Sequence, residues 1–193
     1  QRKIRTASEI WSEYGWQGVL AHFQYVAFKI EQKIVYQKWV KKFDTLTEND
    51  RQAICQRIES FAHQPLISII LPVYNVDEKW LRLCIDSVCK QLYQNWELCI
   101  ADDCSPKPHI RKVLEEYQNK DSRIKVVFRE KNGHISAASN SALEIATGEF
   151  SVLLDHDDEL SQHALYFVAE ELNRFPETQM IYSDEDLISE KGK

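Results

Sequence analysis

From residue 66 onward, short apolar runs alternate with longer segments in which apolar residues recur at helical spacing. The first run, LISIILPVY at 66–74, has no charged residue, which is typical of a strand buried on both faces of a sheet. Strands that alternate with helices predict βαβ units and a mostly parallel sheet, so we expect an α/β fold in this part of the chain. The expected strands span residues 66–74, 96–103, 123–128, 149–155 and 179–184.

The segments between these runs carry residues that start and stop helices. Aspartate and serine side chains accept hydrogen bonds from free N–H groups at a helix N-terminus, and glycine often follows a helix C-terminus. The expected helices are capped by Asp77, by Ser105 with Pro106 in the first turn, and by Ser161, while another spans 135–146 and ends at Gly148.

The first 63 residues show a different pattern. Apolar residues at roughly helical spacing predict one helix over residues 8–43, in which Gly15 and Gly18 are candidate breaks. A second helix is expected to start at Thr47, because Asp50 three residues later completes a sequence that resembles a capping box.

Charge also divides the chain. Residues 1–63 contain ten Lys/Arg and seven Asp/Glu, whereas the remaining residues contain 14 and 23 respectively. Together with Pro65, this shift predicts a boundary near residues 62–66, between a helical N-terminal segment (1–63) and an α/β domain (64–193). The net charge of −6 argues against general nucleic-acid binding, which needs a basic surface.

The cysteines and the apolar stretches bear on localisation. The five cysteines, an odd number without a CxxC pair, are expected to be reduced core residues of a cytoplasmic protein. The longest uncharged stretch, Tyr14–Phe28, is shorter than the ~20 apolar residues that a membrane-spanning helix needs. A basic, aromatic-rich face of the N-terminal helices could dock peripherally on the inner face of a membrane, pack on a neighbouring domain or remain solvated. This face comprises Lys29, Lys33, Lys38, Trp39, Lys41 and Lys42.

Polar clusters follow four of the expected strands. In an open parallel sheet, ligands bind at the carboxyl ends of the strands. Several carboxylates at one edge repel each other unless a cation compensates, and oxygen ligands of this kind suit Mg²⁺ or Mn²⁺. The clusters are Pro72-Val73-Tyr74-Asn75, Asp102-Asp103, Asp155-His156-Asp157-Asp158 and Ser183-Asp184-Glu185-Asp186.

Some of these clusters also have a purely structural interpretation. Asp102-Asp103 alone is typical of a turn, whereas the cluster at 155–158 follows an apolar strand and precedes another acid, Glu159. An EF-hand loop starting at Asp155 is excluded, because Leu160 and Tyr166 occupy its sixth and twelfth positions. The sequence has no Walker A loop and no GxGxxG, so we expect a metal to hold phosphate.

Taken in order, the clusters resemble glycosyltransferase family 2, the inverting enzymes with a GT-A fold, over about residues 66–190. The most specific segment is REKNGHISAASNSALEIATGEFSVLLDHDDEL, which resembles the family's run from a polar loop through a helix to the DxD motif. The tail MIYSDEDLISEKGK and the leader VYQKWVKKF further resemble bacterial members that build surface polysaccharides of the cell envelope, often rhamnosyltransferase-like proteins.

The resemblance implies a UDP- or dTDP-sugar donor, a saccharide or lipid-linked saccharide acceptor, and Mn²⁺ or Mg²⁺ as cofactor. It assigns Asp155 to the ribose and diphosphate, and Asp157, with Asp155 and Asp158 nearby, to the metal. In the family the catalytic base lies well downstream of the DxD, so we expect it beyond Lys193 and interpret the chain as a donor-binding half. The nucleotide-binding residues implied are Pro72, Val73, Tyr74, Asp102, Asp103, Asn132, Gly133, Asn140 and Asp155.

Other functions compete with this hexosyl- or deoxyhexosyl-transferase hypothesis. A nucleotidyltransferase of related fold usually carries a glycine-rich basic loop after the first strand, and PVYNVDEKW offers none. A haloacid-dehalogenase-type phosphatase places its DxD on the first strand, whereas this DxD follows the fourth. A non-catalytic nucleotide-sugar-binding module remains as a further alternative.

Overall fold

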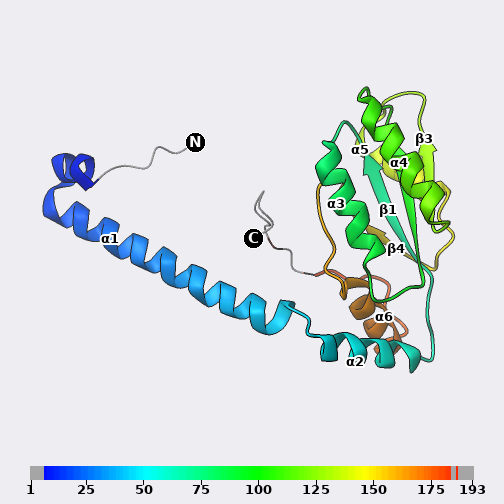
Figure 1. Cartoon of the computed structure of the whole chain (residues 1–193), viewed down its shortest axis with the longest axis horizontal. Helices are drawn as coiled ribbons and strands as arrows, with labels where there is room; N and C mark the ends of the chain where they lie inside the picture. The colour runs from blue at the N-terminus through cyan, green and yellow to red at the C-terminus, as the bar shows by residue number, and fades with distance from the viewer. Residues whose placement is uncertain (1–6, 184–185, 187–193) are drawn as a thin grey trace. The chain divides into compact units, whose positions relative to one another are not determined.

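The computed structural model describes residues 7–183 and residue 186 (Figure 1). The chain forms two compact units, which divide between Asp50 and Arg51. The first unit is helical, and the second contains the sheet.

The N-terminal unit is dominated by one long helix. Helix α1 (Ala7–Trp39) is followed by a short π-helical segment, η1 (Val40–Asp44). Gly15 and Gly18 do not interrupt α1, because a helix tolerates single glycines at a modest cost in stability. No helix among the described residues is both long enough and apolar enough to cross a membrane.

Helix α2 (Glu48–Glu59) starts with the predicted capping box. The backbone N and Oγ1 of Thr47 donate to Asp50 Oδ2 at 2.8 and 2.6 Å, and the backbone N of Asp50 donates to Thr47 Oγ1 at 3.2 Å. Each residue therefore satisfies a free N–H group of the other, and the sequence interpretation is confirmed.

The division at Asp50 lies upstream of the boundary expected near residues 62–66, because most of α2 is bonded to the second unit. Arg57 Nε forms an ion pair with Glu170 Oε1 at 3.1 Å, and Arg51 Nη1 donates to Gln162 Oε1. These contacts join residues more than 100 positions apart, so they could not be inferred from the change in charge along the sequence that suggested the later boundary.

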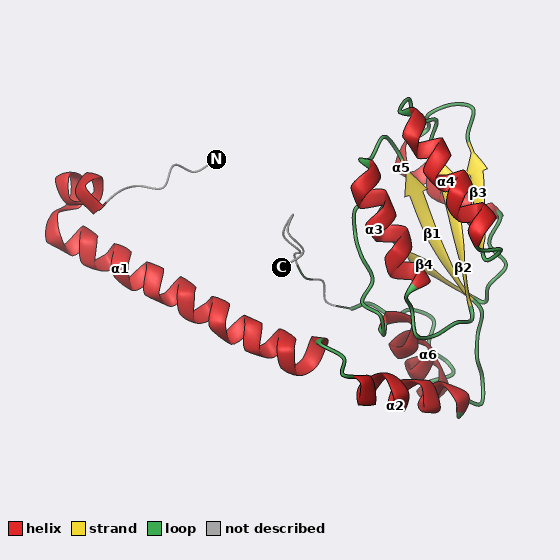
Figure 2. Ribbon diagram, in the orientation of Figure 1, coloured by secondary structure: helices red, strands yellow, loops and turns green. Residues whose placement is uncertain are grey.

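The second unit is built on a four-stranded parallel sheet with the order β3-β2-β1-β4 (Figure 2). Four predicted strands are confirmed. In the register of the sheet, Val73 lies beside Asp102, and Asp102 lies beside Phe128, so the strands end together at one edge. The strands are β1 (Ile67–Val73), β2 (Trp96–Asp102), β3 (Ile124–Phe128) and β4 (Phe150–Leu153).

The fifth predicted strand was wrong over its described residues, 179–183, which have no regular structure. Met180 is 84% exposed and Tyr182 is 92% exposed. Side chains with high β-propensity form a strand only where a neighbouring strand and a packed face are available, and this segment has no strand partner among the described residues.

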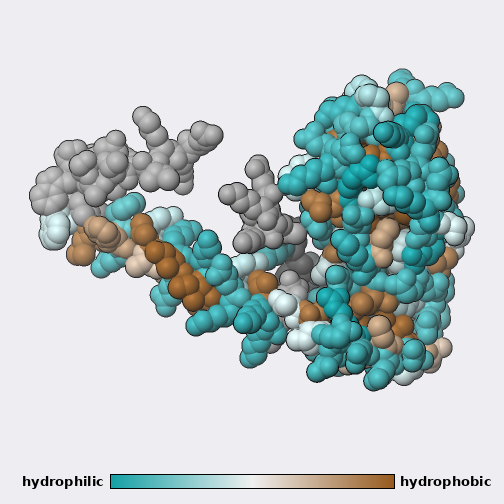
Figure 3. Space-filling model, viewed as in Figure 1, coloured by the Kyte–Doolittle hydropathy of each residue, from teal (hydrophilic) through white to brown (hydrophobic). Residues whose placement is uncertain are grey.

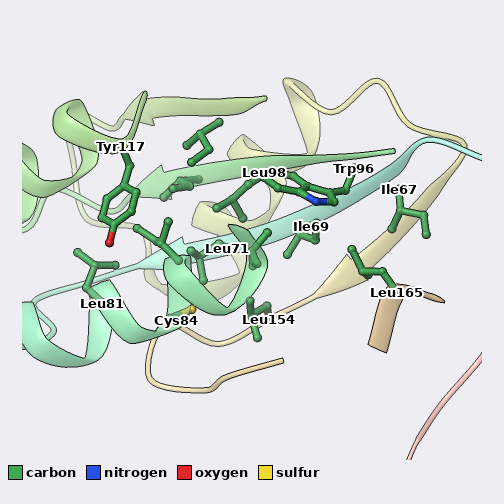
Figure 4. Close-up of a cluster of buried hydrophobic side chains, with 14 of the residues drawn as sticks. Ile67, Ile69, Leu71, Leu81, Cys84, Trp96, Leu98, Tyr117, Leu154 and Leu165 are labelled. Atoms are coloured by element: carbon green, nitrogen blue, oxygen red, sulfur yellow. The ribbon is translucent and has the colours of Figure 1, made fainter. Parts of the chain in front are cut away.

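Helices cover both faces of the sheet. The odd-numbered residues of β1 pack with α3 (Glu78–Cys89) and α4 (Pro108–Lys120), and Figure 4 shows Ile69, Leu71, Leu81, Cys84 and Leu98 in this one buried cluster. On the other face, Ile70, Cys99 and Ala101 pack against α5 (His134–Glu144). The first core also receives side chains from α6 (Ala164–Arg174). The five cysteines are free; Cys84 and Cys99 are buried as expected and Cys89 is partly buried, but Cys55 and Cys104 are exposed, so the expectation that all five are core residues was wrong for these two.

Two predicted helix starts were wrong, and the third is right in position only. Helix α4 begins at Pro108 rather than after Ser105, and α6 begins at Ala164 rather than after Ser161. Asp77 does precede α3, but its carboxylate makes no capping hydrogen bond and pairs with Lys107 Nζ at 3.0 Å. The side chain of Asp77 is thus used in a contact with a residue 30 positions away, which does not follow from local sequence.

Candidate functional site at the carboxyl edge of the sheet

Of the three candidate nucleotide-binding side chains at the end of β1, one is exposed. Pro72 and Val73 are buried, and Val73 belongs to the core shared with α3 and α4. Tyr74 is 47% exposed. The backbone turns sharply at Asn75, whose φ is 53°, and the N–H of Asn75 donates to Ser105 Oγ at 2.9 Å. Tyr74 is therefore the side chain of this group that offers surface to a ligand.

Asp103, at the end of β2, lies at the centre of a polar cluster. It is 2% exposed, and its two carboxylate oxygens accept from the backbone N of Gly133 at 3.0 and 3.1 Å. Arg129 Nε lies 2.9 Å from Asp103 Oδ1, as an ion pair without the alignment of a hydrogen bond. Asp103 is thus a buried carboxylate compensated by one cation and one helix N-terminus.

Asp102 has a different role from its neighbour. Its carboxylate accepts from the backbone N of Ser105 at 3.3 and 3.4 Å, which closes the turn after β2. The structural interpretation of an aspartate in a turn therefore describes Asp102, whereas Asp103 points into the cluster with Arg129.

The loop before α5 is held close to Asp103. Asn132 Nδ2 donates to the backbone O of Asp103 at 3.2 Å. A Cβ on Gly133 would lie 2.7 Å from Arg129 Nη2 and 2.8 Å from Ala137 Cβ, so a side chain here would displace its neighbours. Glycine is required at this point by close packing. Asn140 is exposed about two turns further along α5.

Among the residues that the structure describes, three that are not glycine adopt positive φ: Asn75 (53°), Cys104 (61°) and His134 (64°). They lie in the loops after β1 and β2 and at the start of α5, which all border this edge. Such conformations cost free energy and concentrate at functional sites. The sequence interpretation missed Cys104 and His134, and it also missed Arg129, although Arg129 directly follows a strand and its position could have been noticed.

The acidic loop, defined here as Asp155–Ser161, follows β4. Leu154 is buried and its backbone N donates to Ile70 O at 3.1 Å, after which the chain turns, with Asp158 N donating to Asp155 O at 3.1 Å. Asp155, Asp157 and Asp158 are all exposed. Burial, and then the negative charges of the loop, raise the pKa of the underlying Cys84 thiol to about 12. The loop therefore creates a negative potential that an external cation can meet.

The donor set fits a divalent cation of the Mg²⁺ or Mn²⁺ type. Among the residues the structure describes, no three His, Cys, Asp or Glu side chains converge as a preformed metal cage. Mg²⁺ in nucleotide sites is commonly bound by one or two carboxylates, with phosphate oxygens and water completing its shell. Exposed carboxylates on one turn meet that requirement, whereas a metal that needs a closed protein cage would not fit.

The sheet order places β1 between Asp103 and the acidic loop. Strands β2 and β4 both pair with β1. Strands β2 and β3 lie on one side of β1, whereas β4, which comes later in the chain, lies on its other side, so the strand order reverses at β1. This reversal is where open α/β sheets bind ligands. A separate open hollow lies toward the amino ends of β1 and β2, lined by Cys55, Ile58, Glu59, Gln64, Leu92, Gln94 and Asn95, and it contains none of the predicted site residues.

A family comparison identifies this arrangement. Residues 68–184 match the family described as Glycosyl transferase family 2, which is more than half of the chain. The chain belongs to glycosyl transferase family 2. The match includes the Asp103 cluster and the acidic loop, so both candidate regions lie inside the family's domain.

Relatives of this family 2 chain are considerably longer. It is 49% identical over 146 residues to the uncharacterized protein y4gI of Sinorhizobium fredii, covering 74% of this chain and 16% of that protein. It is 35% identical over 137 residues to the O-antigen biosynthesis protein RfbC of Myxococcus xanthus, covering 71% of this chain and 11% of that protein. The chain thus spans less than a fifth of either relative.

A solved structure shows the same fold. TarS 1–349 of S. aureus in complex with UDP-GlcNAc superposes with a TM-score of 0.51 at 33% identity, covering 56% of this chain and 31% of that chain. The family 2 domain therefore has the expected GT-A, Rossmann-like architecture, preceded by a helical segment.

Proposed function

We propose that this chain is the nucleotide-sugar-binding half of an inverting, metal-dependent glycosyltransferase that acts in bacterial surface-polysaccharide synthesis. The observation that carries the proposal is the placement of the Asp103 cluster and the acidic loop on opposite sides of β1, at the reversal of strand order. The relative RfbC is an O-antigen biosynthesis protein, which supports the polysaccharide context. The hexosyl or deoxyhexosyl group is transferred to a saccharide or lipid-linked saccharide.

The nucleotide base binds at the ends of β1 and β2. The TarS structure contains UDP-GlcNAc, which supports a UDP- or dTDP-sugar as the donor. Tyr74 offers its ring to the base, and Asp103, beside Arg129, accepts the imino N–H of uracil or thymine. Adenine presents no such N–H in that form, so its nucleotides make one hydrogen bond fewer at this carboxylate. Asn132, Gly133 and Asn140 border the nucleotide from the α5 side.

The diphosphate binds over the acidic loop. Asp157, with Asp155 and Asp158, holds Mn²⁺ or Mg²⁺, and Asp155 also faces the ribose and diphosphate. A bound metal supplies charge neutralisation as the nucleoside diphosphate leaves. The chain's own residues hold the donor at both ends and thereby present the sugar at the edge of the sheet.

The acceptor hydroxyl requires a general base, which we place outside residues 1–193. The relatives extend well beyond the matched region, which leaves room for an acceptor-binding part. Robust sugar transfer by residues 1–193 alone would contradict this assignment and would direct attention to the acids that follow α6.

The decisive test is calorimetric titration of UDP into the protein with Mn²⁺. The unaltered chain should bind UDP with Mn²⁺, and EDTA should abolish most of the affinity. Asp157→Asn removes one carboxylate charge with little change of shape and should weaken Mn²⁺-dependent binding at least about 10-fold. Glu177→Gln, a matched change of an exposed acid outside the loop, should leave binding unchanged. Equal affinity with Mn²⁺ and with EDTA would refute the metal role.

We further propose a cytoplasmic location, in which α1 contacts either a neighbouring protein domain or the inner face of a membrane. The apolar side chains along α1, visible in Figure 3, support a partner of some kind, because large exposed apolar surfaces usually mark interaction sites.

A further inference from the structure

We infer that three buried side chains, Cys84 and Ser87 of α3 and Gln91 just after its end, position the acidic loop for metal and diphosphate binding. This inference rests on the proposed function. It assigns a role to residues that touch neither the metal nor the nucleotide and that act through the backbone of the loop.

The three residues lie along the end of α3 and the turn that follows it. Cys84 and Ser87 are three positions apart on α3 and so share a helical face, whereas Gln91 lies two residues after the last helical residue, Cys89. All three are buried, with Cys84 at 0%, Ser87 at 6% and Gln91 at 1% exposure. Polar groups buried this deeply need defined partners, and here the partners belong to the acidic loop and the start of α6.

Each side chain bonds to the backbone at a different point. Cys84 Sγ donates to the carbonyl of Asp155 at 3.4 Å, at the beginning of the loop. Ser87 Oγ accepts from the N–H of Leu160 at 3.0 Å, near its end. Ser87 Oγ also donates to the carbonyl of Cys84 at 2.6 Å, which fixes the direction of its lone pairs.

Gln91 secures the point where the loop enters α6. Its Nε2 donates to the carbonyl of Ser161 at 2.7 Å, and its Oε1 accepts from the N–H of Leu165 at 3.0 Å. The backbone N of Leu92 adds a bond to the carbonyl of Gln162 at 2.9 Å. The amide thus uses both of its ends on the segment that follows the acids.

These anchors hold both ends of a segment whose middle carries the charge. Residues 156–159 contain three acids between the bonds made at Asp155 and Leu160. Carboxylates this close repel one another, and repulsion alone would spread the loop. A thiol, a hydroxyl and an amide oppose the spreading without adding a positive charge. The acids therefore keep their negative potential for a cation while their separation is limited.

The test uses two variants that remove one anchor each, Ser87→Ala and Gln91→Met. Mn²⁺ affinity is measured in the full chain by electron paramagnetic resonance, with MnCl₂ titrated at a fixed concentration of UDP and at a temperature well below unfolding. We expect each variant to bind Mn²⁺ about 3- to 10-fold more weakly, because one net hydrogen bond no longer defines the loop. Asp157→Asn serves as the reference for loss of a direct ligand.

Ser68→Ala is the control for a merely structural effect. Ser68 is also fully buried and donates to Glu97 Oε1 at 2.7 Å, but its strand position lies near the amino end of β1. Ser68→Ala should lower the melting temperature as Ser87→Ala does, yet leave the Mn²⁺ affinity unchanged. If the unaltered chain bound no Mn²⁺ with UDP, the proposed function would fall and the positioning role with it. Equal Mn²⁺ affinity in the unaltered chain and in both the Ser87→Ala and Gln91→Met variants would overturn the positioning role alone.

Discussion

Glu97 shows how a single buried charge is stabilised in the sheet. It lies in β2 near the amino end of the sheet and is 4% exposed. Burial alone would raise the pKa of its carboxyl, but Lys125 Nζ at 2.6 Å and the backbone N of Thr147 at 2.5 Å oppose this effect. Together with hydrogen bonds from the Ser68 and Thr147 hydroxyls, they lower the pKa to about 2. The ionised carboxylate is therefore more favourable in the folded protein than in the unfolded chain.

The pH dependence of stability follows from this shift. A folded-state pKa below the unfolded value stabilises the protein at pH values above ~4.3, and this contribution is lost as the pH falls toward the folded pKa. We expect Glu97→Gln to lower the free energy of unfolding at pH 7 by about 2–4 kcal/mol, because Lys125 loses its buried partner. Urea unfolding at several pH values measures this. The deficit should shrink between about pH 4.5 and pH 2, and a deficit independent of pH would contradict the assignment.

Gly133 tests the arrangement around Asp103. Gly133→Ala places a Cβ 2.7 Å from Arg129 Nη2, which should displace the guanidinium and disturb the carboxylate of Asp103. We expect UDP affinity to fall about 10-fold, in line with ~1–3 kcal/mol for a poorly paired buried group. Preference for UDP over ADP should fall with it, as measured by competition calorimetry.

Gly148→Ala is the matched control. Its Cβ would lie 2.5 Å from Leu66 O, so it should destabilise the fold by a similar steric mechanism at the opposite end of the sheet. Nucleotide preference should not change in this variant. A loss of UDP preference of the same size in both variants would show that general destabilisation explains the effect.

Secondary-structure elements were predictable where their signals are local. β1 is a nearly continuous apolar run and β2 is apolar except for Glu97 and Asp102, and both strands are buried at every position, so the sequence pattern and the burial largely agree. The start of α4 was not predictable, because the hydroxyl of Ser105 accepts a bond from Asn75, 30 residues away. The segment 179–183 has the composition of a strand, but a strand also requires a partner, which composition does not reveal.

The candidate site likewise divides into features with local sequence signals and features that depend on distant residues. The acids after β2 and β4 were predicted, because strand ends in a parallel sheet share an edge and the residue types are visible in the sequence. The positive φ angles of Cys104 and His134 were not predictable, since they depend on how the loops pack together. Cys84, Ser87 and Gln91 could not be recognised as loop anchors, because their partners are backbone groups about 70 residues away.

Helix α1 has apolar side chains on two sides. Trp16, Leu20, Phe23, Ile30 and Ile34 recur at spacings that keep them on one face, and Tyr25, Phe28, Val35, Trp39 form a second stripe on a different face. A helix that lies on a membrane surface needs one apolar face and one polar face. The two stripes of α1 instead favour packing between protein neighbours.

We therefore predict that α1 does not carry the protein to membranes. In flotation assays with vesicles containing phosphatidylglycerol, residues 1–193 should stay with the soluble fraction at physiological salt. Lys29 and Lys33, in the C-terminal half of α1, allow the opposite outcome to be tested. Flotation that is abolished by high salt and by Lys29→Glu with Lys33→Glu would show that the basic face binds the membrane.

At the scale of the whole molecule, ligand binding should stabilise one unit only. The predicted donor site lies entirely within the unit Arg51–Lys193, whereas the side chains of α1 described in the first unit are largely exposed. A ligand that binds only the folded state adds RT ln(1 + [L]/Kd) to the free energy of unfolding of the unit that binds it. The two units should therefore respond differently to the same ligand.

Differential scanning calorimetry with UDP and Mn²⁺ tests this prediction. At a UDP concentration about 100 times Kd the gain is about 2.7 kcal/mol, which corresponds to a rise of roughly 5–10 °C in the melting temperature of the sheet-containing unit. Any transition of the helical unit should stay in place. UDP with EDTA, and ADP with Mn²⁺, should each give a smaller rise, because the first lacks the cation for the acidic loop and the second offers no imino N–H to Asp103. An equal rise with all three ligand mixtures would show that binding depends neither on the loop nor on Asp103.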